Sequence, residues 1–409
     1  MLSRSFASSR TAAVARSAAA RRAFSTSEVS GVSVAVREDL RPVSKVSVVV
    51  KAGSRYGSTP GVAHLLEKFA FKNTANRSAL RLVRESELLG GELSSSISRE
   101  NIVLTSSFLR EDLPYFVEAL ADTTQNGLFK KYELIEDVAP IAFAEAAKAA
   151  SSPALASEQA AYEIAFRSGL GESIYVEPYS PVSIEQVADY AKEAYTKANI
   201  SIAATNVVEA DLKALVEEHF AGLSVGEAIA TAPSKVFGGE SRVKAAGSSA
   251  LTLVFPSTST SAASAVLASL LGGVSTIKWS TGSSLLGVAS TKSGASVKAS
   301  YTPYSDASVL AITIAADDAA AVAEAAKLVA ADLKAVAAGT AAEAVPKAVA
   351  QTKFAQALAS EGSLPVSVLD ASAVTAEAVA EAAATLLKGP IALGAVGKVH
   401  SLPYLDELF

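Results

Sequence analysis

The stretch GVAHLLEKFAFKNT, Gly61 to Thr74, places three polar residues on one face of a predicted helix. Positions i, i+3 and i+4 share a helix face, so His64, Glu67 and Lys68 project together. His-x-x-Glu is half of a zinc-binding pattern in which a histidine follows the glutamate directly. In this chain the next residue is a lysine instead. The stretch therefore raises the question of whether the helix carries a working metal site.

The zinc chemistry that this helix would support is incomplete. A hydrolytic zinc site needs three protein ligands, an open position for water and a nearby carboxylate as general base. His64 is a candidate ligand and Glu67 a candidate base, but lysine titrates near pH ~10.4 in unperturbed peptides, so Lys68 is a cation at neutral pH. The alternative is that His64 packs in the core and that Glu67 and Lys68 are ordinary charges at the rim of the helix.

Composition restricts the remaining chemistry. The 409 residues include no cysteine, which excludes disulfides, thiolate zinc sites and cysteine nucleophiles. Besides His64 there are two histidines, His219 near the end of a predicted helix and His400 in the C-terminal tail. A cation at a helix C-terminus interacts favourably with the helix dipole, so we expect His219 to be structural, and we expect no ligand role for His400. No glycine-rich phosphate-binding pattern occurs.

Charge and hydropathy exclude two further classes of protein. The formal net charge is −5, and the body of the chain has no run of lysine or arginine, so the sequence predicts no nucleic-acid binding. Half of the residues are apolar, yet no uninterrupted apolar run approaches the 18 residues or so that a transmembrane helix requires. We therefore expect a folded protein that does not span a membrane by itself.

The first 24 residues have the composition of a targeting sequence. They are rich in serine and alanine and contain five arginines but no acidic residue. Such a leader is typical of a mitochondrial transit peptide, although a disordered basic tail is the alternative. We expect residues 1–24 to be removed, which lowers the formal net charge from −5 to −10. The arginines are Arg4, Arg10, Arg16, Arg21 and Arg22.

The rest of the chain alternates strand and helix patterns, which predicts an α+β fold with helices on one face of a sheet. Predicted strands lie at 31–39, 44–53, 92–109 as a hairpin, 199–206, 249–256 and 289–317 as a second hairpin. Predicted helices lie at 61–72, 78–90, 112–127, 131–150, 154–168, 183–195, 211–220, 261–273 and 318–338. Ser183 and Gln186 fit a capping box at the start of one of these helices.

The order of elements in the first half recurs in the second half. In both halves a Leu-Leu-Gly sequence precedes a hairpin and then a helix that opens with acidic residues. This recurrence indicates an internal duplication of about 200 residues. Residues 224–240 carry Pro233 and two adjacent glycines without periodicity, and they are predicted to be a linker. The expected lobes are then 25–223, with the degenerate zinc motif, and 241–409.

The motif resembles the inverted-zinc helix of the pitrilysin and mitochondrial processing peptidase family. The family pattern is H-x-x-E-H followed by F-K-[GN]-T, and the last four positions match FKNT at 71–74. In that family the third ligand is a glutamate about 76 residues beyond the second histidine, a spacing that leads from Lys68 to Glu145. His64, Glu67 and Glu145 thus occupy the family's first-ligand, base and third-ligand positions, and Lys68 replaces the second ligand.

The resemblance implies an α+β fold of two homologous lobes, each built of α+β repeats with helices on a mainly antiparallel sheet. It also implies no catalytic residue, no bound metal and no cofactor, because one zinc ligand of three is missing. We further expect Lys68 to form an ion pair with Glu145 where the metal would otherwise sit. Charged groups more than about 6 Å apart would remove the basis for this pair.

Two segments narrow the resemblance to a non-catalytic branch of the family found in respiratory complex III. They are residues 77–122 and the C-terminal GAVGKVHSLPYLDEL, 394–408. This branch implies a structural subunit on the matrix side of the mitochondrial inner membrane, peripheral to it, that serves the assembly and stability of a dimeric ubiquinol–cytochrome c reductase. The implied partners are a homologous core protein 1, cytochrome b, cytochrome c1, the Rieske iron–sulfur protein and small subunits.

The alternative function is the presequence-binding α-type subunit of the processing peptidase. That subunit carries a dense glycine-rich loop in its second half. The corresponding region here, LLGGVSTIKWSTGSSLLG at 270–287, has only scattered glycines. A metallopeptidase that acts alone is a third alternative, and Lys68 counts against it.

Overall fold

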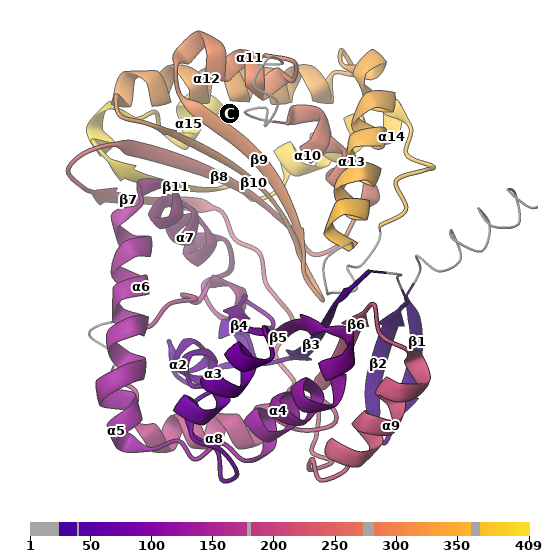
Figure 1. The fold of residues 1–409 in the computed structure, drawn as a ribbon. Helices are drawn as coiled ribbons and strands as arrows, with labels where there is room; N and C mark the ends of the chain where they lie inside the picture. Colours follow the sequence, from indigo (N-terminus) through magenta and orange to yellow (C-terminus); the bar gives the residue numbers. More distant parts are fainter. Residues whose placement is uncertain (1–23, 39–40, 178–180, 273–281, 361–368) are drawn as a thin grey trace, which may run out of the picture. The chain divides into compact units, whose positions relative to one another are not determined.

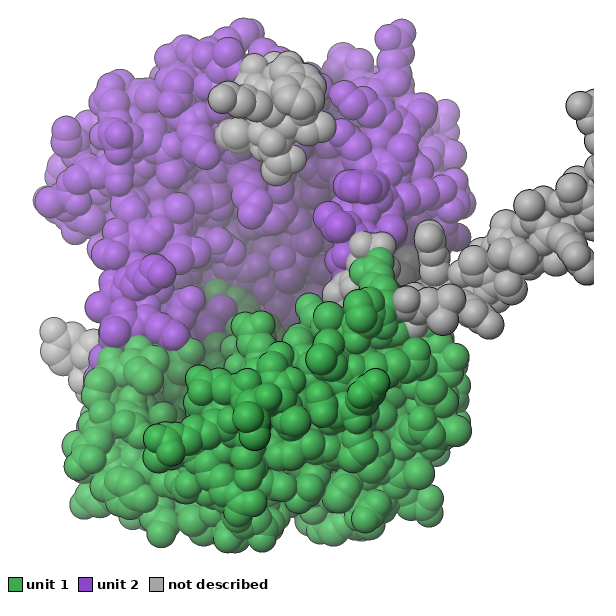
Figure 2. Space-filling view, in the orientation of Figure 1, with its two compact units in different colours: residues 1–142, 178–230, 360–366 green, residues 143–177, 231–359, 367–409 purple. Residues whose placement is uncertain are grey.

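The computed structural model describes residues 24–38, 41–177, 181–272, 282–360 and 369–409. The chain divides into two compact units (Figures 1 and 2). Unit 1 comprises 1–142, 178–230 and 360–366, and unit 2 comprises 143–177, 231–359 and 367–409. Residues 143–177, which lie inside the range expected for the N-terminal lobe, group with unit 2. The predicted transit peptide, 1–24, lies outside the described residues except for Phe24.

Unit 1 is built on a six-stranded sheet with the order β1-β2-β6-β3-β5-β4. Only β2 and β6 run parallel, and every other neighbouring pair is antiparallel. Buried and half-exposed residues alternate along β5, as expected for a strand with one face in the core. The strands are β1 (Ser25–Val29), β2 (Val32–Arg37), β3 (Val43–Val50), β4 (Glu92–Ile97), β5 (Ile102–Leu109) and β6 (Ile200–Thr205).

Helices of unit 1 pack on this sheet and on one another. Helix α4 contacts β3 and β5, α2 contacts β4 and α8, and α9 contacts β1, β2 and α4 (Figure 1). Ser183 and Gln186 form the predicted capping box at the start of α8. The helices are α2 (Val62–Lys68), α3 (Ala79–Leu88), α4 (Leu113–Gln125), α5 (Lys131–Glu133), α8 (Ile184–Ala194) and α9 (Glu209–His219). A π-helical turn (Leu134–Val138) joins α5 to α6 (Ala139–Ser151), and short 3-10 turns occur at Ser54–Tyr56, Arg110–Asp112 and Gly169–Gly171.

Unit 2 repeats the topology of unit 1. Its five-stranded sheet has the order β7-β11-β8-β10-β9, in which β7 and β11 are parallel and the other neighbours antiparallel. Strands β7, β8, β9, β10 and β11 thus take the places of β2, β3, β4, β5 and β6, so the predicted duplication and the mainly antiparallel sheets are confirmed. The strands are β7 (Gly239–Lys244), β8 (Ser249–Ser257), β9 (Ser296–Pro303), β10 (Ser308–Ala316) and β11 (Ala392–Gly397).

Both faces of the unit 2 sheet are covered, which the sequence did not predict. One face packs leucines and isoleucines such as Leu253 and Ile312 against the helices that follow in the chain. The other face packs small residues of β8, β10 and β11 against α7 (Pro153–Phe166). The helices of the first face are α10 (Ala262–Leu271), α11 (Leu285–Ser293), α12 (Ala319–Ala337) and α14 (Ala376–Lys388), and the unit also contains α13 (Val345–Ser360) and α15 (Leu405–Leu408) with 3-10 turns at Ala342–Ala344 and Val399–Ser401.

A glycine allows α7 to approach the sheet closely. A Cβ atom on Gly394 of β11 would lie 2.7 Å from the backbone nitrogen of Ala161 and closer still to the carbonyl oxygen of Ser157. The side chain of Ser157 is hydrogen-bonded to Thr252 of β8 at 2.8 Å. Because only glycine fits where two backbones meet, Gly394 sets the distance between α7 and the sheet.

Some predicted elements differ from the structure. The helix predicted at 61–72 ends at Lys68, and it cannot continue to residue 72 because Phe71 adopts a left-handed backbone with φ of 61°. Leu285-Leu286-Gly287 begins helix α11, whereas Leu88-Leu89-Gly90 ends helix α3, so these matched triplets are not equivalent positions. Helix α11 also occupies the start of the hairpin predicted at 289–317. In the described part of the chain, no helix has the length and apolarity to cross a membrane.

Candidate functional site

The helix that carries the degenerate motif is short and buried. Helix α2 is preceded by its N-cap residue Gly61, whose φ of 86° is a left-handed conformation that favours glycine. Its apolar residues recur at helical spacing, and Val62, Leu65 and Leu66 are all buried. His64 and Glu67 are buried too, with exposed fractions of 0% and 1%. The alternative interpretation expected Glu67 to be a charge at the rim of the helix, and this is wrong. The same interpretation expected His64 to pack in the core, and it does.

The Glu67 carboxylate is engaged by two side chains. Its Oε1 accepts a hydrogen bond from the Ser95 hydroxyl on β4. Lys68 Nζ lies 3.1 Å from its Oε2, and the lysine side chain is only 18% exposed. Oε2 itself accepts no hydrogen bond of good geometry from the described residues. The contact between Lys68 and Glu67 is therefore an ion pair without a hydrogen bond of good geometry. Adjacent residues of a helix point in different directions, so the lysine side chain has to fold back to reach Glu67.

These residues do not fit a catalytic zinc ion. The general base of such a site must be free to take a proton from a metal-bound water. The Glu67 carboxylate is not free in this sense, because the ammonium of Lys68 lies beside it. A protonated lysine in place of the second ligand also repels a dication. The described residues contain no cluster of three histidine, aspartate or glutamate side chains with metal-binding geometry.

The other predicted site residues lie on separate elements. Glu145 lies on α6, in the segment that groups with unit 2, whereas Lys68 belongs to unit 1. The Lys68–Glu145 ion pair therefore stays a prediction. His219 is the last residue of α9, as expected, and its carbonyl oxygen accepts a hydrogen bond from Gln125 Nε2 at 2.8 Å. His400 is exposed in a short 3-10 turn before α15.

The FKNT sequence after α2 has a structural role. The Thr74 hydroxyl donates to the buried carboxylate of Asp122 on α4, which also accepts from Asn76 at 2.6 Å and from Asn126 at 2.7 Å. Asn73 donates from its backbone and its side chain to Glu133 of α5. This loop therefore ties α2 to α4 and α5 through two buried carboxylates.

Sequence reasoning missed the partners of the motif. Ser95, Asp122 and Glu133 are separated from it by tens of residues, and no local pattern marks them. Tyr195, which follows α8, was also missed. Its side chain is buried, and burial together with the negative charge of Glu67 raises the pKa of its hydroxyl.

Comparison with known proteins agrees with this picture. Residues 33–177 match the family described as Insulinase (Peptidase family M16), and residues 181–352 match the Peptidase M16 inactive domain. The chain is 42% identical over 417 residues to a protein of Yarrowia lipolytica named cytochrome b-c1 complex subunit 2, mitochondrial, an alignment that covers 98% of this chain and 100% of that protein.

Other relatives show how far the likeness extends. The protein of the same name from Neurospora crassa is 42% identical over 427 residues, covering 97% of this chain and 93% of its own. A probable mitochondrial-processing peptidase subunit alpha-2 of Arabidopsis thaliana is 31% identical over 222 residues, covering only 53% of this chain and 44% of its own. The repeated topology, the degenerate motif and these alignments agree: the chain belongs to the insulinase family, peptidase family M16, and groups there with relatives named cytochrome b-c1 complex subunit 2.

Proposed function

We propose that the chain is a non-catalytic structural core subunit of mitochondrial respiratory complex III, needed for the assembly and stability of the ubiquinol–cytochrome c reductase. The observation that carries this proposal is the near-complete alignment with relatives that are named as subunits of the cytochrome b-c1 complex. The alignment with the processing peptidase subunit covers only 53% of this chain. The presequence-binding alternative is therefore disfavoured.

The motif supports a structural role over a catalytic one. Lys68 replaces a zinc ligand, and its ammonium lies 3.1 Å from the carboxylate that would act as base. The surrounding hydrogen bonds through Ser95, Asn73 and Thr74 join helices and strands of unit 1. The frame of a peptidase is thus kept as a scaffold, while the chemistry that it served is lost.

The partners and the location follow from the same proposal. The chain pairs with a homologous core protein 1 and associates with cytochrome b, cytochrome c1, the Rieske iron–sulfur protein and small subunits of a dimeric complex. It lies on the matrix side of the inner membrane and is peripheral to it. The leader at 1–24, with five arginines and no acidic residue, supports import into mitochondria.

The test is an affinity purification of the tagged full chain from gently solubilised mitochondria, with quantitative mass spectrometry of the proteins that copurify. Recovery of cytochrome b, cytochrome c1 and the Rieske protein in equal stoichiometry is the expected result. Recovery of a soluble processing peptidase β subunit alone would overturn the proposal and would make presequence binding the function.

A further inference from the structure

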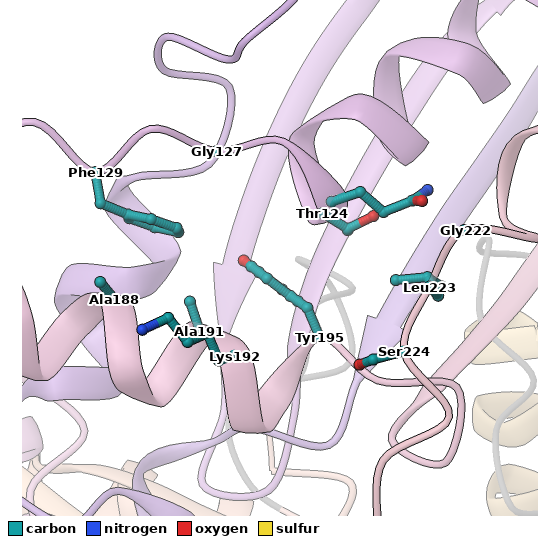
Figure 3. Close-up of a pocket in the computed structure, with 11 residues that line it drawn as sticks. Thr124, Gly127, Phe129, Ala188, Ala191, Lys192, Tyr195, Gly222, Leu223 and Ser224 are labelled. Atoms are coloured by element: carbon teal, nitrogen blue, oxygen red, sulfur yellow. The ribbon is translucent and has the colours of Figure 1, made fainter.

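A pocket in unit 1, whose described lining includes none of the motif residues, has no role in the proposed function. It has a volume of about 510 Å³, within the range of about 300–1,000 Å³ that is usual for small-molecule sites. Figure 3 shows its walls, which come from the end of α4, the loop at 127–129, helix α8 and the loop at 222–224 that follows α9. These four segments meet in the helical layer of one compact unit, so the pocket is part of a single folded body.

The pocket contains a tyrosine hydroxyl that is available for hydrogen bonding to a ligand. Tyr195 is only 8% exposed, and its hydroxyl points into the pocket between Phe129 and Thr124 (Figure 3). Among the residues that the structure describes, none forms a hydrogen bond with this oxygen, and the oxygen is not among the fully buried side-chain atoms that lack a partner. Like any tyrosine at neutral pH, Tyr195 has a protonated hydroxyl that can donate to an acceptor.

The aromatic wall of the pocket is held in a strained conformation. Phe129 has a φ of 45°, which is unusual for a bulky residue. Its ring packs edge-on against Phe69 with centroids 5.5 Å apart. The backbone on either side is pinned, because Leu128 donates to the Asn73 carbonyl at 3.1 Å and Gly127 forms a β-bridge with Thr74. Strained residues of this kind concentrate at functional sites.

Two glycines keep the pocket open. A Cβ on Gly127 would lie 3.2 Å from the Phe129 ring, and a Cβ on Gly222 would lie 2.9 Å from the side-chain oxygen of Gln125. The Gln125 amide nitrogen is already committed to the His219 carbonyl, so its oxygen remains as an acceptor beside the pocket. Tyr195 and Gln125 therefore provide a donor and an acceptor beside the aromatic face of Phe129.

The charge that lines the pocket lies at its rim. Lys192 is the one charged side chain among the described residues that line it. Its ammonium is paired with Asp189 at 2.8 Å, and both side chains are more than 70% exposed at the rim. An exposed pair of this kind contributes little binding energy. A neutral ligand is therefore favoured over an ionic one.

From these features we propose that the pocket is a binding site for a neutral, planar aromatic molecule that bears a hydrogen-bond acceptor. The ring of the ligand packs on Phe129 and the adjacent Ala188 and Ala191, and its acceptor takes the hydrogen bond of Tyr195. A ligand N–H group, where present, is matched by the oxygen of Gln125. Aromatic carboxamides have this arrangement of ring, acceptor and donor.

The test uses benzamide and benzoate, which have the same ring and differ in charge, with saturation-transfer difference NMR on the full chain. We expect benzamide to bind with a dissociation constant in the millimolar range and benzoate to bind at least threefold more weakly. Tyr195→Phe should weaken benzamide binding about three- to tenfold, the usual value of one hydrogen bond. Ala188→Trp, which fills the pocket from a half-buried position on α8, should abolish binding.

The matched control is Tyr404→Phe, which removes a tyrosine hydroxyl from an exposed side chain of unit 2, outside the pocket. This variant should bind benzamide like the unaltered chain, and thermal unfolding should show that all three variants are folded. Equal binding by Tyr195→Phe and the unaltered chain would overturn the proposal. So would benzoate binding as tightly as benzamide, or no benzamide binding at millimolar concentration.

Discussion

Replacing Gly394 by alanine tests the closeness of α7 to the unit 2 sheet. The added Cβ would lie 2.7 Å from the Ala161 nitrogen, whereas an ordinary contact of this atom is at least 3.4 Å. The helix must therefore withdraw by roughly 1 Å, and a gap of about 0.5–1 Å already forfeits a quarter to a half of the dispersion attraction. Neither obstacle can rotate away, because both are backbone atoms of α7.

The expected cost is at the upper end of the range for overpacking, about 3 kcal/mol. The apolar cluster under α7 contributes to this cost, since Tyr162 and Phe166 are each only 2% exposed. For a unit of this size, a loss of about 1 kcal/mol lowers Tm by roughly 2–4 °C, so the variant should unfold roughly 6–12 °C earlier. Differential scanning calorimetry of the full chain is the assay, because it separates the transitions of two units.

The matched control is Gly389→Ala in the same unit. Its added Cβ would meet the carbonyl oxygens of Leu386 and Thr385 at 3.5 Å, which is an ordinary contact, and its φ of −75° suits alanine. We expect no loss of stability, or a gain of about 0.4–1 kcal/mol from the stiffer unfolded chain. If Gly394→Ala unfolds at the temperature of this control, α7 does not pack on β11 as described.

Three further perturbations test the motif and its surroundings. Asp122→Ala removes a buried acceptor of three side-chain hydrogen bonds. It should lower the free energy of unfolding, measured in urea, by about 3 kcal/mol. A decrease of less than about 1 kcal/mol would show that the FKNT loop is not anchored at Asp122. A double-mutant cycle of Lys68→Met and Glu145→Gln should give a coupling energy of at least about 0.5 kcal/mol, whereas additive effects would refute the predicted ion pair. Burial, together with the hydrogen bond to Glu85, raises the pKa of Tyr115 from 10.0 to about 12. The stability that this residue contributes is therefore complete below pH 10.0 and declines as pH rises toward 12, and Tyr115→Phe should flatten that decline in urea unfolding measured across this pH range.

Local patterns were sufficient to predict the repeated α+β architecture. Period-2 alternation marked β3 and β5, and the capping box at Ser183 marked the start of α8. These signals succeed because each depends on neighbours within a few residues. The lysine at position 68, where the family pattern has a histidine, was equally visible, because it is present whatever the fold around it.

The sequence did not predict the elements that lack a local signature. Helix α13 has no amphipathic period and exposes Phe354 and Leu358. Strand β11 is buried along its whole length, so it shows no alternation. A strand covered on both faces reads as a continuous run of small or apolar residues. Its position in the sheet depends on β7 and β8, which precede it by more than a hundred residues.

By itself, the sequence determined the duplication, the helix and strand order of most of the chain, the absence of cysteine chemistry and the lysine in the degenerate motif. Only the tertiary structure decided that α7 groups with unit 2, that Glu67 is buried beside Ser95 and Lys68, and that Tyr195 faces a pocket. The physical reason is that these features arise from contacts between residues far apart in the chain. Burial and close approach are properties of the packed elements, and no short stretch of sequence encodes them.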